Sequence, residues 1–204
     1  MALTAQSVLS DLDAALPQAT DAWRSTALRQ IMELFVSGAD SFSGEQIALF
    51  DEVMGRLIKK MDRARLVELS GALASAGIAP AKVLGSLARH ADPAIHGPVL
   101  ERAKALPDTD LIEIADKDRI DPSVLAKIAA RGELSEPVTD ILLKRGNAAM
   151  RRKIIENPNA RVSEMGFARV VSGINGDKAL AAAIAARPEM PAELRPFVDA
   201  ALAQ

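Results

Sequence analysis

Two histidines and an aspartate lie close together in the chain, at His90, Asp92 and His96, and they are its candidate metal ligands. Imidazole nitrogens and carboxylate oxygens bind zinc, and a helical zinc site places two ligands three or four residues apart on one face. Pro93 interrupts this stretch, so the spacing defines no such face. We interpret His90 as a residue at a helix C-terminus, where the helix dipole favours a cation, and expect no metal site.

Carboxylates gather between residues 108 and 121, and hard cations bind oxygen ligands of this kind. The cluster consists of Asp108, Asp110, Glu113, Asp116, Asp118 and Asp121. It lacks the Asp-x-Asp-x-Asp-Gly loop and the closing Glu of an EF-hand. Asp108 and Asp110 suit a helix first turn, and Asp121 before Pro122 suits an N-cap followed by proline at the first helical position. We therefore expect a solvated acidic face and no cofactor.

Basic side chains are concentrated between residues 144 and 169, which makes this stretch the candidate partner-binding surface. They are Lys144, Arg145, Arg151, Arg152, Lys153, Arg161 and Arg169. Successive repeat helices can present such groups on one ridge, which would suit a protein or a nucleic acid. Phe167 is the one aromatic residue of the stretch, so it offers little for base stacking. The alternatives are a charged solvent face or a contact with the acidic 108–121 edge of another copy.

Residue patterns typical of enzymes are missing. The sequence has no Cys, no Gly-rich phosphate loop and no His-Glu-x-x-His motif. HEAT-like glycosylases show that helical repeats can perform chemistry with an Asp and aromatic residues, but this chain lacks Tyr, and Trp23 is remote from the repeats. We expect no enzymatic activity, and the remaining enzymatic alternative is a DNA-repair-type activity on a HEAT-like scaffold.

The composition favours an all-α protein. Hydrophobic residues make up 49% and charged residues 25% of 204 residues, while aromatic residues make up only 3%. Ala and Leu dominate, and both are strong helix formers. The net charge of −2 provides no global attraction to nucleic acid or to an anionic membrane. With no secretory signal, no run long enough to span a bilayer and no cysteine, we expect a cytoplasmic protein that does not contact membranes.

The N-terminal part, residues 1–77, is predicted to form four helices, at about 4–16, 21–38, 43–61 and 62–77. Residues 43–61 carry apolar side chains at spacings of three and four over a wide arc, which two neighbouring helices must cover. This arc includes Phe50, Met54 and Met61. We predict that this part either caps the rest of the chain or forms a homodimer through these three side chains.

The C-terminal part, residues 78–204, is predicted to be an array of short helices separated by Pro and Gly. Helices of this length bury little surface alone and must stack. Two of them, at 124–131 and 135–145, form the best-defined pair, and the pattern recurs at 150–157 and 179–187. We align His90, Arg131, Asn157 and Arg187 as equivalent helix ends. The irregular spacing, with an extra helix at 108–117, favours degenerate HEAT-like repeats over tetratricopeptide or ankyrin arrays.

Several short motifs occur in order through the second half of the chain. They are Leu87-Ala-Arg-His-Ala-Asp-Pro, Asp110-Leu-Ile-Glu-Ile-Ala, Ile128-Ala-Ala-Arg-Gly-Glu-Leu-Ser-Glu-Pro, Glu156-Asn-Pro-Asn-Ala-Arg-Val-Ser and Arg187-Pro-Glu-Met-Pro. This series resembles a bacterial family of domains of unknown function, numbered 2336, whose members are similar to HEAT-type helical repeats. The resemblance implies a bacterial helical-repeat protein and brings no catalytic residues with it.

Together these features predict a HEAT-like α-solenoid preceded by an N-terminal four-helix part. The leading functional hypothesis is a non-enzymatic interaction, scaffold or regulatory module that binds a protein partner. The alternative is a nucleic-acid-binding repeat protein that uses the basic stretch 144–169.

Overall fold

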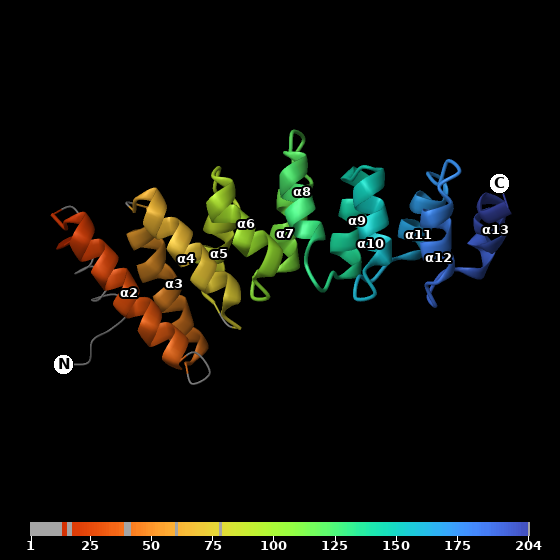
Figure 1. Ribbon diagram of the computed structural model, residues 1–204. Coiled ribbons are helices and arrows are strands. Elements are labelled where there is room, and N and C mark those ends of the chain that lie inside the picture. Colours follow the sequence, from red (N-terminus) through yellow and green to blue (C-terminus); the bar gives the residue numbers. More distant parts are fainter. Residues whose placement is uncertain (1–13, 16–17, 39–41, 60, 78, 204) are drawn as a thin grey trace. The chain divides into compact units, whose positions relative to one another are not determined.

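The computed structural model describes residues 14–15, 18–38, 42–59, 61–77 and 79–203, and every element in this part of the chain is a helix (Figure 1). The helices are α2 Asp21–Gly38, α3 Gly44–Ile58, α4 Arg63–Ser75, α5 Ala81–Ala88, α6 Pro93–Arg102, α7 Asp108–Ala115, α8 Pro122–Ala129, α9 Glu136–Arg145, α10 Ala148–Glu156, α11 Glu164–Val171, α12 Lys178–Ala185, the 3₁₀ helix η2 Ala192–Leu194 and α13 Arg195–Ala203. The all-α prediction is confirmed. The helix predicted at 4–16 falls almost wholly outside the described residues.

The contacts between helices divide the chain into two compact units, Met1–Pro107 and Asp108–Gln204. In the first unit α2 packs on α3, α3 on α5, and α4 on α6. Helix α3 therefore has the two neighbours that its wide apolar arc requires, and Met54 and Leu57 are fully buried there. The boundary predicted near residue 77 lies inside this unit, between α4 and α5, and it stays a prediction.

In the second unit each helix packs on the next helix but one. Helix α9 contacts both α7 and α11, while α10 contacts both α8 and α12, and α13 packs on α12. Consecutive helices also pair, and α9 and α10 lie side by side (Figure 1). A large aliphatic residue lies three positions before each of three aligned helix ends: Ile128, Ile154 and Ile184. All three are fully buried, so they pack in the core between the helices.

Polar side chains begin most of these helices at the residues that the sequence indicates. Ser43 forms a capping box with Gln46, and Asp62 accepts a hydrogen bond from the Arg65 backbone N–H at 2.9 Å. Asp121 caps α8, with Pro122 at the first helical position. Such caps satisfy the free N–H groups of the first turn and are each worth about 1 kcal/mol. Because the helices are short, these local interactions set where each begins.

Candidate partner-binding groove

The basic residues of the 144–169 stretch lie on α9, α10 and α11 and in the connection between α10 and α11, and several of them bond within the chain. Arg145 donates through Nη2 to the backbone oxygens of Lys117 and, at 3.4 Å, of Asp118. Lys144 Nζ lies 3.7 Å from Asp116 Oδ1. The basic cluster thus meets the end of the acidic stretch inside one chain, at the connection between α7 and α8.

Helix α10 directs two of its arginines toward neighbouring elements. Arg151 Nε donates to the backbone oxygen of Leu143 at 3.1 Å, at the end of α9. Arg152 forms an ion pair with Asp177, the N-cap of α12. The pKa of the Asp177 carboxyl is lowered, first by the Leu180 backbone N–H that it accepts and then by the Arg152 guanidinium. These two cations therefore join helices within the unit.

Lys153, Arg161 and Arg169 are the exposed remainder of the predicted basic surface, and among the described residues their side chains have no hydrogen-bond or ion-pair partner. Lys144 of α9 and Arg169 of α11 both line a shallow groove of about 320 Å³ between these two helices. The predicted ridge is therefore not one continuous surface of available charge. Two of its residues, Lys144 and Arg169, line one hollow, which we call the α9–α11 groove.

The α9–α11 groove combines an exposed apolar side chain with charge. Met165 is 67% exposed, and it lines the groove together with Ile141 and Pro137. Single exposed apolar residues are common, but Met165 shares this hollow with Lys144 and Arg169, so the hollow offers both apolar contact and positive charge. The groove is therefore suited to a partner segment that carries an apolar side chain beside carboxylates.

The floor of the groove is held rigidly by contacts between the two helices. Ser163 Oγ donates to Asp140 Oδ1 at 2.6 Å and accepts from the Gly166 backbone N–H at 2.9 Å. A Cβ on Gly166 would lie 3.0 Å from Asp140 Oδ1 and from Val162 Cγ1. A larger residue at this position would therefore have to displace side chains at the contact between α11 and α9. The Ser163 hydroxyl, which caps the start of α11, therefore also holds the Asp140 carboxylate of α9.

The histidines considered as metal ligands take part in a local network. His90 follows α5 and accepts the Asp92 backbone N–H through Nδ1 at 3.0 Å, and His96 Nδ1 lies 2.9 Å from the His90 backbone oxygen. Asp92 caps α6 and pairs with Arg63, and this pairing lowers the pKa of the Asp92 carboxyl. Across the described residues, no group of three or more His, Cys, Asp or Glu side chains is arranged to hold a metal ion.

The three side chains predicted for dimerisation have different environments. Met54 is wholly buried within the chain, and Phe50 packs with Phe35 and Phe42 at ring-centroid distances of 5.3 and 4.9 Å. Met61 is half-buried and lines a cleft between α2 and α4. Met54 is therefore not available to a second copy in this structure. Dimerisation through Phe50 and Met61 stays a prediction.

One structural role was missed by sequence reasoning. Asp51 of α3 is buried and accepts the backbone N–H groups of Lys82 and Val83, each at 2.9 Å, so it caps α5 from another helix. The sequence signal for this role was the position of Asp51, a carboxylate on the apolar side of the predicted 43–61 helix. Pro80, at the start of α5, has no side chain that can cap.

The aligned helix ends also bond to one another. Arg187 donates to the backbone oxygens of Asn157, at 2.6 Å, and of Ile155, at 3.3 Å, while Asn157 Nδ2 donates to the Arg131 backbone oxygen at 3.1 Å. Arg131 itself is largely buried, and this burial lowers its pKa against the opposing influence of Asp108. Three of the four aligned ends, Arg131, Asn157 and Arg187, are thus joined by hydrogen bonds, and their equivalence as repeat ends stays a prediction.

A bacterial protein family matches the part of the chain that contains the groove. The model of the family DUF2336, described as an uncharacterised protein conserved in bacteria, matches residues 95–196, which is half of the chain. The chain belongs to this family. The DUF2336 segment includes α7 to α12, and hence the whole α9–α11 groove and the series of bonded helix ends. Comparison with curated proteins and with solved structures gave no match.

The match confirms the family resemblance seen in the sequence motifs. It adds no activity, because the family description names none. Within the described residues, no helix is long and apolar enough to cross a membrane. The chemistry of the DUF2336 segment must therefore be argued from the groove itself.

Proposed function

We propose that the chain is a non-enzymatic protein-interaction module whose helices form HEAT-like repeats, and that the α9–α11 groove binds a segment of a partner protein. The single observation that carries the proposal is the exposed Met165, which lines this groove together with Lys144 and Arg169. Apolar anchors in a hollow with a charged rim are the usual arrangement at protein interfaces. A partner segment with an apolar side chain and adjacent carboxylates fits it.

The HEAT-like part of the proposal is supported by how the helices of the second unit stack. Each of α9 and α10 contacts the helices two positions before and after it, as in a two-layer repeat array. The bonded helix ends Arg131, Asn157 and Arg187 recur at equivalent positions. The short parallel bridge between Leu134 and Ala160 joins the equivalent connections that follow two of these ends.

Photo-crosslinking tests the groove directly. A photoreactive amino acid placed at Met165 and expressed in the native bacterium should give discrete adducts with a partner protein. Phe197 on α13 is the matched control, because it is 64% exposed against 67% for Met165 but lies outside the groove. Replacing Lys144 and Arg169 together by Glu should abolish the Met165 adducts. No adduct at Met165, or the same adducts at Phe197, would contradict the proposal.

A further inference from the structure

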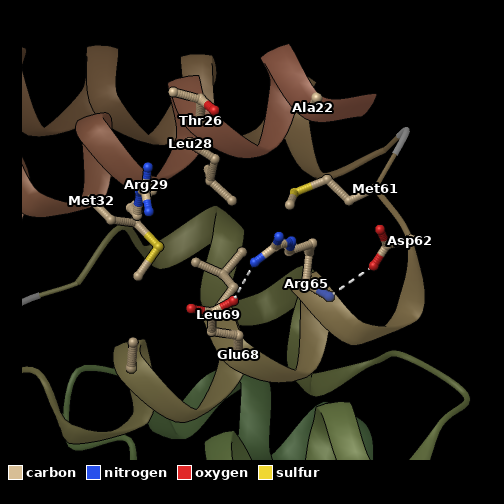
Figure 2. Close-up of a pocket in the computed structure, with 11 residues that line it drawn as sticks. Ala22, Thr26, Leu28, Arg29, Met32, Met61, Asp62, Arg65, Glu68 and Leu69 are labelled. Carbon is tan, nitrogen blue, oxygen red and sulfur yellow. Dashed lines mark hydrogen bonds and ion pairs between the residues drawn. The ribbon is translucent and has the colours of Figure 1, made fainter. Parts of the chain in front are cut away.

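A second concave site lies in the first unit, between α2 and α4, and it is separate from the α9–α11 groove. Figure 2 shows Leu28 and Met32 of α2 and Met61 of the α3–α4 connection entering this cleft, with Leu69 of α4 on the other side. Its volume is about 410 Å³. Small-molecule sites have volumes of roughly 300–1,000 Å³ and are mostly apolar with a few convergent polar groups. The α2–α4 cleft has a volume in this range, and its lining combines apolar side chains with the charged residues Arg29, Asp62, Arg65 and Glu68.

The charged side chains that line the α2–α4 cleft differ in whether they have a partner within the chain. Arg65 Nη1 donates to Glu68 Oε2 at 3.0 Å, and the Asp62 carboxylate accepts the Arg65 backbone N–H at 2.9 Å. These contacts occupy both acidic residues of the lining. Arg29, on the opposite wall, is exposed and has no side-chain partner among the described residues. One guanidinium therefore remains available beside an apolar cleft.

We propose that the α2–α4 cleft binds a small amphiphile with an apolar chain and a single anionic head, of which a medium-chain fatty carboxylate is the simplest example. The chain would lie among the methionine and leucine side chains, where flexible thioethers adapt to irregular shapes. The head would pair with Arg29, because guanidinium groups bind carboxylates through charge-assisted hydrogen bonds. The Met61–Asp62 connection lines one end of the cleft, which favours a short ligand over a partner helix that runs through it.

Calorimetric titration of the full chain with decanoate at pH 7, below its micelle concentration, tests this site. Saturable binding is expected, together with a rise in the unfolding temperature, because a ligand that binds only the folded state stabilises it. Trp23 is the one tryptophan and lies on α2, so its fluorescence offers an independent readout. Decyltrimethylammonium, which has the same chain and a cationic head, should bind at least about tenfold more weakly.

Two pairs of variants separate a specific site from general surface adsorption. Arg29→Gln should weaken decanoate binding about tenfold or more, since it removes a hydrogen bond to a charged group, whereas Arg102→Gln, an exposed cation on α6, should not. Ala72→Leu places a larger side chain in the cleft and should block binding, while Ala64→Leu on the same helix but outside the cleft should not.

Three outcomes would overturn the proposal. They are absence of saturable decanoate binding to the unmodified chain, equal affinity for the cationic amphiphile, and unchanged affinity in Arg29→Gln or Ala72→Leu. All of these measurements leave the α9–α11 groove intact, so their failure would not bear on the proposed protein-binding function.

Discussion

Individual polar side chains in the second unit connect one helix end to the next. The Arg187 side chain is only 9% exposed, and its guanidinium reaches backbone oxygens at and after the end of α10, including that of Asn157. The last carbonyls of a helix have no partner within the helix, so a cation placed there satisfies them and interacts favourably with the helix dipole. In the sequence Arg187 is only a charge near the end of a helix, whereas in the structure it stabilises the end of the neighbouring helix α10.

Substitution of Arg187 by Lys should lower the free energy of unfolding by about 1–3 kcal/mol, the range for hydrogen bonds that involve charged groups. Lysine keeps the charge, but its single ammonium cannot reproduce the planar fork that contacts several carbonyls at once. Urea unfolding followed by circular dichroism measures the change. Arg195→Lys on α13, where the side chain is exposed, is the control and should be nearly neutral. Equal stability of the two variants would contradict the role assigned to Arg187.

At the scale of elements, the closeness of α9 and α11 determines the candidate groove. Gly166 allows the approach, and the Ser163 hydroxyl joins the start of α11 to Asp140. Gly71 in α4 has no such role, since a Cβ there would meet nothing within 4 Å. The same residue type is therefore tightly packed in one helix and open to substitution in another.

We expect Gly166→Ala to destabilise the chain by about 1–3 kcal/mol, the usual cost of overpacking, because the new methyl group displaces α9 or the Asp140 carboxylate. Gly71→Ala should instead be neutral or stabilise by up to about 1 kcal/mol, because alanine has the higher helix propensity. Thermal and urea unfolding of the two variants in parallel provide the comparison. The expectation fails if Gly166→Ala is as stable as Gly71→Ala. Photo-crosslinking from Met165 should also weaken in Gly166→Ala.

For the whole molecule, charge distribution distinguishes the two functional hypotheses. The chain carries a net charge of −2, and several cations of the basic stretch are engaged by Asp116, Asp177 or backbone oxygens. Nucleic-acid affinity grows with the number of phosphates that cations neutralise. Within the basic stretch, the exposed cations without a partner among the described residues are Lys153 on α10, Arg169 on α11 and Arg161 in the connection between them.

We therefore expect no saturable binding of duplex DNA at about 50 mM salt, a concentration at which electrostatic binding is strong. Fluorescence anisotropy of a labelled duplex measures this. If binding is seen, its loss on joint replacement of Lys153, Arg161 and Arg169 by Gln would favour the nucleic-acid alternative. Arg152 is unsuitable for this test, because its replacement also breaks the ion pair with Asp177.

The sequence by itself determined the helical class, most helix bounds of the described residues and the family. Alanine- and leucine-rich segments with apolar residues at spacings of three and four can only bury their surface as packed helices. Caps such as Ser43, Asp62 and Asp121 lie next to the helices that they begin. These are local signals, which depend on neighbours in the chain, and they were correct for that reason.

Only the tertiary structure decided which charged side chains are available to a partner. Arg152 and Lys153 are adjacent in sequence, but Arg152 pairs with Asp177 while Lys153 remains exposed. The Asp51 cap on α5 likewise joins residues about thirty positions apart. Such pairings depend on which helices pack together, and neither composition nor periodicity contains that information. The basic stretch was therefore visible in the sequence, whereas the groove between α9 and α11 was not.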